Sequence, residues 1–484
     1  MKPCGEKYHL ALLALFIAFC LVFSVDSFGQ TETSGFPSDD SLLQINSIAL
    51  AGNKITKDQI LLREMILKPG DFINPARLDT LLSRSRENLM NTLLFNYVEI
   101  SVNVDEKDSN LLNISVEVVE RWYIWPIPIL KISDRNFNVW WQTKDLSRLS
   151  YGFYIDWRNF RGRKENLITR FQWGYGRNLS IQYLVPYLNR KKTMGLGFGA
   201  GYSRQKETAY RTMYNKQEFF KEPDDFARED VFAFGQFLLR KNIYTSHQFE
   251  LRYDQHHFSD SLVQKYPDFT SDSSSQVRYL TFNYMMKFDH RDFKSYPLKG
   301  SYADLSVIKY GLWTFNENTL NTFSILATYR KYFELSPRVF FATGLNGQIS
   351  AGLQPYFILK GIGYDRDIVR SYEYYLVDAQ HFAILKNNIK FSLLQNRDKK
   401  IDFIRTEKFS RIYYAMYLNV FFDAGYGYYD QDFGTETNDL QNALLMGYGT
   451  GLDFVTYYDV VIRLEFSMNF KNEAGVYLHF RAPI

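Results

Sequence analysis

Hydrophobic and polar positions alternate along most of the chain after residue 121, which is typical of β-strands with one apolar face. The alternation is cleanest from Val460 to Phe470, where every even-numbered position is apolar and most odd-numbered positions are polar. We count about sixteen such strands, an even number, as single-chain bacterial barrels require. A soluble β-sandwich would alternate in the same way. The pattern alone therefore predicts strands and leaves the architecture open.

The lengths of the connections favour a membrane barrel over a sandwich. The long loops, near 204–230, 257–276, 350–376 and 425–443, all follow odd-numbered strands, whereas most connections after even-numbered strands are short. A barrel with short periplasmic turns and long external loops gives this parity when the chain enters from the periplasm. The connection near 395–411 is an exception, because it should be periplasmic and is long. We therefore predict a transmembrane β-barrel of about 16 antiparallel strands over residues 121–484.

The N-terminus reads as a targeting segment. Lys2 and Lys7 precede an apolar run, and small residues before Gln30 offer a cleavage site, so we predict a signal peptide over residues 1–29 and an exported protein. Both cysteines lie inside this segment, so the mature chain should hold no disulfide. Cys20 leaves lipidation open, although the bulky Phe19 before it argues against processing. No later apolar stretch reaches the ~18 residues that a membrane helix needs.

A small α/β module is predicted between the signal peptide and the barrel. Residues 30–42 read as a linker and residues 43–120 as a strand, two helices and two strands. We expect the first helix to run from Thr56, as N-cap, to Leu67, and the second to open at Pro75 and close at Asn96. The last two strands, 97–104 and 112–119, alternate strictly.

Composition fits this reading. The chain is 17% aromatic, yet its mean hydropathy is −0.30. A transmembrane barrel needs such a balance, because half of each strand faces water while aromatic girdles mark both interfaces. The net charge of only +4 implies no nucleic-acid partner.

One long loop carries the main candidate chemistry. Arg370 lies in residues 361–372, and an arginine removed from water needs a carboxylate or several carbonyls as partners. Asp423 is the best candidate, because it alternates with Leu418, Val420 and Phe422 and should face the lumen. The alternative is that Arg370 is a solvated loop charge.

Glycine and proline mark two further strands. Between Met194 and Tyr202 glycine occupies every inward position, which leaves room for a returning loop or eases barrel curvature.

In residues 122–130, the likeliest first strand, Pro126 and Pro128 both lack an N–H on the same side, so one edge of that strand is weak. If the first strand must pair with the last, the weak edge is the barrel seam. The alternative is that residues 122–130 are a linker.

The α/β module at 43–120 is followed by a turn that contains Asp289, Arg291, Asp292, Pro297 and Gly300. A loop with Val369, Arg370, Ser371 and Tyr372 comes next, then the strand that holds Asp423, and last a C-terminal stretch with Gly475, Leu478 and Phe480. In this order the motifs resemble those of the BamA/TamA superfamily of outer-membrane assembly factors. The resemblance implies that the module is a POTRA domain, although an unrelated α/β module stays open, that the loop arginine pairs with the aspartate strand, and that the other two stretches are a turn signature and a sorting signal.

The sequence also departs from that family. Ser371 replaces the usual glycine, only one POTRA-like module is present, and residues 386–391 lack a glutamate often found in the twelfth strand. Four residues, 481–484, extend beyond Phe480, where the family often ends. The first two departures put equivalence with the central insertase in doubt, and the third leaves Asp423 as the main counter-charge.

The resemblance implies a factor of the Gram-negative outer membrane with its POTRA domain in the periplasm. Unfolded outer-membrane or secreted polypeptides, membrane lipid and accessory assembly subunits are the implied partners. We weigh three functions: insertion or translocation of many clients, a dedicated secretion pore for one partner, and a passive barrel. We expect no enzyme, cofactor or metal, because the histidines lack ligand spacing and no catalytic set converges, although barrel enzymes exist. Clients, subunits, pore conductance and strand boundaries stay open.

Overall fold

The computed structural model describes residues 42–132 and 149–480, apart from positions 223, 271, 316–319, 353, 402, 405, 431–436, 457 and 459. The predicted signal peptide, all but the last residue of the predicted linker, and the C-terminal residues 481–484 lie outside the described residues. Within the described part, no helix is long and apolar enough to cross a membrane.

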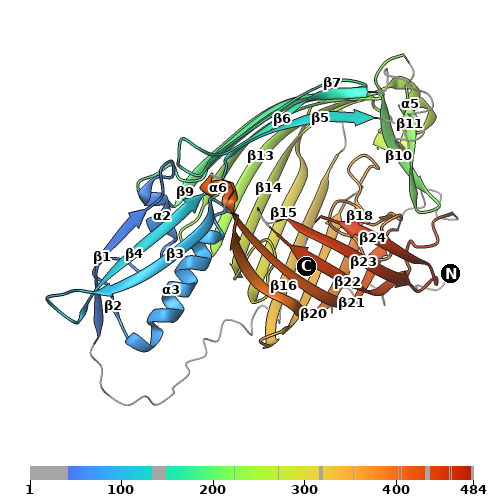
Figure 1. The fold of residues 1–484 in the computed structure, drawn as a ribbon. Coiled ribbons are helices and arrows are strands. Elements are labelled where there is room, and N and C mark those ends of the chain that lie inside the picture. Colours follow the sequence, from blue (N-terminus) through green and yellow to red (C-terminus); the bar gives the residue numbers. More distant parts are fainter. Residues whose placement is uncertain are drawn as a thin grey trace. The chain divides into compact units, whose positions relative to one another are not determined.

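The N-terminal module folds as a four-stranded sheet with two helices (Figure 1). Its elements are β1 (Leu43–Ala51), α2 (Asp58–Glu64), β2 (Phe72–Ile73), α3 (Pro75–Met90), β3 (Phe95–Val104) and β4 (Leu111–Glu120). The strand order is β2-β1-β4-β3, with β1 parallel to β4 and β3 antiparallel to it. The apolar faces of both helices and the sheet meet in one core around Ile45, Leu61, Leu89 and Val116.

Three predicted helix ends in this module are wrong, and one of them is the end of α2, which lies at Glu64 rather than Leu67. Thr56 does not cap α2: its Oγ1 donates to Glu120 Oε1 at 2.7 Å, and α2 begins at Asp58 after Lys57, whose side chain makes no capping bond. Because the Thr56 hydroxyl bonds to the Glu120 carboxylate, it does not accept a bond from the first turn of the helix, as a capping box requires. The second helix ends at Met90 rather than Asn96, because Leu93 has a positive φ of 61° that no helix continues through.

A sixteen-stranded antiparallel sheet follows (Figure 1). Each strand pairs with its neighbours in chain order. The strands are β5 (Ile124–Ile132), β6 (Leu149–Phe160), β7 (Glu165–Gly174), β8 (Gly176–Val185), β9 (Met194–Gln205), β12 (Arg228–Leu239), β13 (Thr245–Phe258), β14 (Gln276–Arg291), β15 (Gly300–Phe315), β16 (Thr322–Ser336), β17 (Val339–Ala351), β20 (His381–Lys400), β21 (Arg411–Tyr428), β22 (Leu444–Val455), β23 (Val461–Asn469) and β24 (Ala474–His479).

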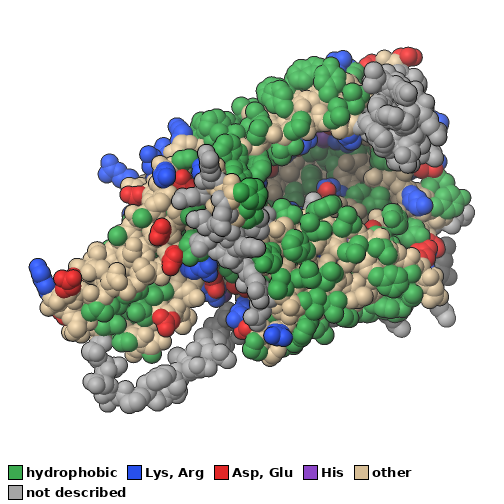
Figure 2. Space-filling view, in the orientation of Figure 1, with side chains coloured by type: hydrophobic (Ala, Val, Ile, Leu, Met, Phe, Trp, Pro, Cys, Tyr) green, Lys and Arg blue, Asp and Glu red, His purple; other side chains and the backbone are tan. Residues whose placement is uncertain are grey.

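The sheet is apolar outside and polar inside, the reverse of a soluble protein. Phe198, Ile389 and Val420 are exposed on the outer face, while Asn419 and Asp423 are fully buried on the inner one. Figure 2 shows apolar side chains covering the strands and basic side chains inside the hollow. An apolar outside can be stable only where lipid replaces water, so the predicted barrel class is confirmed.

The connections keep the predicted parity. Loops after odd-numbered strands carry β10 (Glu207–Met213), β11 (Lys216–Lys221), α5 (Asp260–Lys265), the 3-10 helix η2 (Pro267–Thr270), β18 (Gly361–Ile362) and β19 (Val377–Asp378). The connection expected to be long near 395–411 spans only residues 401–410, with α6 (Glu407–Ser410), because β20 continues to Lys400.

The glycines of β9 make room for a neighbouring strand, not for a returning loop. A Cβ on Gly199 would approach the Phe234 ring to 2.6 Å, and one on Gly201 would overlap the Phe232 ring. Both phenylalanines come from β12, which pairs with β9 in register. On the inner face, the aromatic rings of β12 therefore lie over the glycine backbone of β9.

Candidate functional site in the lumen, at the seam and at the domain junction

The loop between β17 and β20 carries Arg370 into the lumen. Arg370 Nε donates to Asp423 Oδ2 at 2.7 Å and Nη2 donates to Asp423 Oδ1 at 2.5 Å, a bidentate pair. The Arg370 and Asp423 side chains are only 3% and 0% exposed. The alternative of a solvated loop charge is therefore wrong in this structure, since the guanidinium is enclosed.

Further groups surround the Arg370 guanidinium, among them the Asn387 carbonyl, which accepts from Nη2 at 3.4 Å. Nη1 donates to Asn388 Oδ1 at 3.0 Å, and the guanidinium lies over the Phe421 ring at 3.7 Å from its centroid. Glu465 Oε1 lies 3.6 Å from Nη1 and provides a second carboxylate. Sequence reasoning missed Glu465, although its place on the polar face of the last cleanly alternating strand was a signal.

Small residues let the loop backbone approach the barrel wall. A Cβ on Gly447 would collide with the Arg370 carbonyl oxygen, and one on Gly425 would collide with the Val369 side chain. Val369 and Tyr372 are buried with Ile362 in an apolar cluster. Ser371 has φ +78°, in the left-handed region that favours glycine, so the serine holds a strained backbone conformation here.

The predicted turn signature spans the end of β14, the turn after it and the first residue of β15. Asp289 and Arg291 form a bidentate pair at 2.7 and 2.9 Å, and Asp292 accepts from the backbone of Phe293 and Leu298. Gly300 has φ +101° where β15 begins. The carbonyl of Pro297 accepts from Lys390 Nζ at 3.3 Å.

This turn reaches the lumen through Tyr296, which sequence analysis did not single out. The Tyr296 hydroxyl donates to Asp453 Oδ2 at 2.6 Å, and its ring stacks on Tyr417 at 4.9 Å. Lys390 Nζ lies 4.2 Å from the same ring centroid. The turn and the Arg370 loop thus attach to the same stretch of wall, β20 to β23.

A cavity of about 910 Å³ lies between the loop, the turn and the wall. Its lining holds the acidic residues Asp289, Asp365 and Glu373. The basic residues outnumber them: Lys287, Arg291, Lys294, Arg330, Arg366, Arg370, Lys386 and Arg463. The cavity therefore presents a positive surface to whatever enters the lumen.

The seam lies between the two terminal strands of the sheet, β5 and β24. Each pairs on one side only among the described residues, β5 with β6 and β24 with β23. Residues 122 and 123 precede β5, and the alternative that 122–130 are only a linker is wrong, since Ile124 already pairs with Trp157.

Pro126 and Pro128 lie within the continuous ladder between β5 and β6, opposite Ile155 and Phe153. Proline cannot donate to a ladder, so both missing donors belong to the other edge, which faces the seam. The start of β5 is attached at its base: Trp122 N–H donates to the Tyr458 hydroxyl at 3.0 Å, and the Trp125 and Tyr458 rings meet at 5.2 Å.

The C-terminal signal residues occupy and follow β24. Gly475 lies on the inner side, where a Cβ would meet the Tyr477 ring at 2.7 Å. Leu478 and Phe480 are 57% and 65% exposed on the outer side. They thus continue the lipid-facing surface at the seam.

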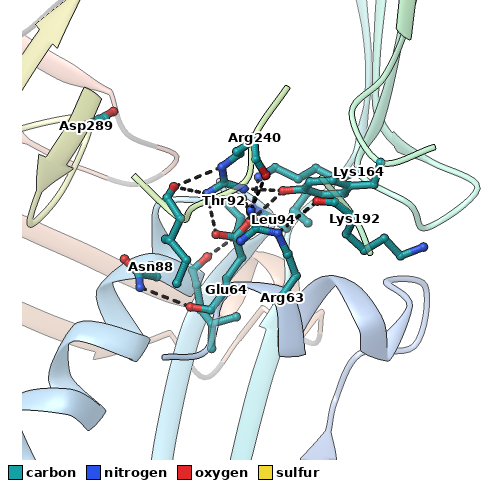
Figure 3. A network of polar contacts seen from close by, with 12 residues as sticks. Arg63, Glu64, Asn88, Thr92, Leu94, Lys164, Lys192, Arg240 and Asp289 are labelled. Atoms are coloured by element: carbon teal, nitrogen blue, oxygen red, sulfur yellow. Dashed lines mark hydrogen bonds and ion pairs between the residues drawn. The ribbon is translucent and has the colours of Figure 1, made fainter. Parts of the chain in front are cut away.

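The junction between the N-terminal module and the barrel turns is a buried ionic network (Figure 3). Glu64 of α2 accepts from Arg240 Nη1 at 2.5 Å and Nη2 at 2.8 Å, and from the Tyr187 hydroxyl at 2.8 Å. Arg63 donates to the carbonyls of Lys192, Arg240 and Asn242. Sequence reasoning missed this network, although a glutamate beside Ile60 and Leu61 on the apolar face of a helix was a signal.

The network holds Glu64 ionised. Burial raises the pKa of Glu64, but the charges of Lys164 and Arg240 and the bonds from Arg240 and Tyr187 outweigh burial and lower it overall. Burial lowers the pKa of Lys164 to about 7, although Glu64 opposes that shift from 3.7 Å. One carboxylate thus faces two cations, and the arginine binds it directly.

Comparison with known proteins supports the two-part architecture. Residues 43–121 match the POTRA family model, described as surface antigen variable number repeat. Comparison with curated proteins gives no match.

Similar solved structures include CdiB from Escherichia coli, with a TM-score of 0.50 at 12% identity over 90% of this chain and 75% of that one. BamA from Haemophilus ducreyi lacking POTRA domains 1–3 gives a TM-score of 0.48 at 15% identity over 90% and 83%. CdiB from Acinetobacter baumannii gives 0.48 at 13% identity over 90% and 73%. Residues 43–121 are therefore a POTRA domain, and the strands that follow share the barrel fold of CdiB, as the resemblance to POTRA-plus-barrel assembly factors predicted.

Proposed function

We propose that this protein inserts or translocates unfolded polypeptides at the outer membrane of a Gram-negative bacterium, with the POTRA domain in the periplasm. The observation that carries the proposal is that, among the described strands, the two terminal strands of the barrel have no sheet partner across the seam and the POTRA sheet has an open edge. The apolar outer face provides the contact with lipid. In this proposal the protein works without enzymatic chemistry, and its partners are client polypeptides and accessory assembly subunits.

The POTRA domain captures an extended client at β3. This strand ends the order β2-β1-β4-β3, and no described strand pairs with its outer edge. An exposed edge accepts an extended chain by adding it as a further strand. Ser101 and Glu99 are exposed on β3, so a client strand would lie beside polar side chains rather than beside an aggregation-prone apolar edge.

The seam then passes the client into the membrane. With Pro126 and Pro128 on the free edge of β5, a closed seam would lack two ladder bonds, each worth ~0.5–1.5 kcal/mol. The seam is therefore the weakest line in the sheet, and a client strand can pair with the edges of β5 and β24 that face it. The contacts of Trp122 and Trp125 with Tyr458 would keep the base of β5 in place.

A disulfide across the seam tests this proposal. Cysteines placed near Ile127 and near Tyr477 should lock β5 to β24, abolish client assembly, and release it again on reduction. The control pair replaces Leu464 and Leu478, which already face each other in register on β23 and β24. That disulfide should leave assembly unchanged, since it crosses no seam.

Photo-crosslinking in living cells tests client capture at β3. Ser101 and Ser115 face each other in register, but Ser101 lies on the edge strand and Ser115 on the central strand β4. A crosslinker at position 101 should capture unfolded barrel precursors, and the same group at position 115 should capture far less. Equal capture from both positions would contradict edge pairing.

A dedicated secretion pore is the second candidate, favoured by the basic cavity of about 910 Å³ in the lumen. In that case one cognate partner leaves through the lumen and the seam stays closed. Full activity of the protein locked near Ile127 and Tyr477 would favour this function over insertion.

A further inference from the structure

Three ionisable side chains meet behind the Arg370 loop, and the proposed function assigns no role to the cluster that they form. Glu373 follows the loop motif, Glu465 lies on β23, and His479 ends β24, the strand at the seam. One ligand atom from each lies within 4.8 Å of the other two. The topology brings them together from separate parts of the chain, so no spacing in the sequence revealed the cluster.

The separations are too long for hydrogen bonds. His479 Nε2 lies 3.5 Å from Glu465 Oε2 and 3.7 Å from Glu373 Oε1. A tetrahedral zinc ion with bonds of about 2.1 Å keeps its ligand atoms roughly 3.4 Å apart. Both distances from the His479 nitrogen are close to that spacing.

Among the described residues, these polar atoms also lack hydrogen-bond partners. His479 Nε2, both oxygens of Glu373 and both oxygens of Glu465 are buried without a hydrogen bond, and the Glu465 side chain is 0% exposed. Buried carboxylates are normally satisfied, so each such group needs an explanation. A bound cation would satisfy all three side chains at once.

The neighbouring arginines leave one side of this cluster free. Arg463 Nε lies 3.0 Å from Glu465 Oε1 and Arg370 Nη1 lies 3.6 Å from the same oxygen. Arg370 is already paired with Asp423. The remaining oxygen, Oε2, faces His479 and Glu373, so the arginines and a cation would use opposite oxygens of one carboxylate.

We propose that Glu373, Glu465 and His479 bind one zinc ion that ties the lumen loop to the last strand beside the seam. Two carboxylates and one imidazole supply three ligands, and water would complete the tetrahedron. An imidazole among the ligands favours zinc over Mg²⁺ or Ca²⁺, which prefer oxygen alone. The ion would join the loop to both β23 and β24, and so strengthen the terminal strand on which seam opening depends.

Metal analysis of the folded full-length barrel in detergent tests the site. The protein is loaded with Zn²⁺, dialysed, and measured for bound zinc, while Co²⁺ loading reports tetrahedral geometry through its visible absorption. We expect one zinc per chain in the wild type, and at least a tenfold loss of affinity in Glu373→Gln and His479→Asn. His479→Cys should restore binding, since a thiolate is also a zinc ligand.

The matched control is His257→Asn, which makes the same change at an exposed histidine of β13 outside the cluster. It should keep one zinc per chain. The heat-resistant folded band on unboiled gels shows that each variant is folded. A folded wild type that retains no zinc, or cluster variants that retain as much as the wild type (an adventitious ion only), would overturn the site.

Discussion

Replacing Arg370 by alanine should weaken the barrel more than any other single change in the loop. The substitution removes the bidentate bonds to Asp423, the bond to Asn388 and the contact with the Phe421 ring. It also leaves Asp423, which is 0% exposed, without its hydrogen-bonded counter-charge. Removing one member of a buried pair costs ~3–5 kcal/mol.

A double-mutant cycle separates the pair from its surroundings. Asp423→Ala should cost a similar amount, because it leaves Arg370 without its hydrogen-bonded carboxylate and with Glu465 at 3.6 Å as a more distant counter-charge. The double variant should cost clearly less than the two single changes together, by at least about 1–2 kcal/mol, because neither charge is then left alone.

Denaturant titration of the folded band on unboiled gels would measure these costs, and limited proteolysis would report release of the loop. The control is Arg366→Ala, an exposed arginine four positions earlier in the same loop, which should change stability by less than about 0.5 kcal/mol. Strict additivity of the two single variants, or an Arg370→Ala protein as stable as the control, would refute the reasoning.

Three further predictions follow from the seam, the junction and β9. Phe480→Ala should lower assembly into membranes, while deletion of residues 481–484 should be tolerated; equal assembly of Phe480→Ala and wild type would remove the sorting assignment. The pKa of Glu64 is lowered from its ordinary 4.5, so the ionised carboxylate stabilises the POTRA–barrel junction above that pH, and this stabilisation is lost as the pH falls below it. Protease cleavage at the junction should therefore rise on acidification in the wild type. In Glu64→Gln it should be high at all pH values. Gly201→Val should destabilise the barrel by overlapping the Phe232 ring, and Phe232→Ala should rescue it; failure of that rescue in denaturant titration would contradict the packing of β12 over β9.

Sequence alone determined the class of the fold and the direction of its strands. Alternation has a period of two residues and depends only on positions close together in the chain, so a strand can be recognised without knowing which strand pairs with it. The parity of loop lengths then distinguished a barrel from a sandwich, and the order of strands and helices in residues 43–120 predicted the POTRA domain that the family model matches. The predictions that Thr56 caps the first helix and that Asn96 closes the second were wrong. Thr56 donates its hydroxyl to Glu120 instead, and the positive φ of Leu93 ends the second helix earlier.

Only the tertiary structure decided which charges meet. Arg240 reaches Glu64 across 176 positions of sequence, and Glu373 meets Glu465 and His479 through the path of a loop inside the barrel. It also showed that the rings of Phe232 and Phe234 fill the space above the glycines of β9. Such contacts depend on strand register and loop path, which are set by the summed packing of the whole sheet, and no local pattern of residues encodes them.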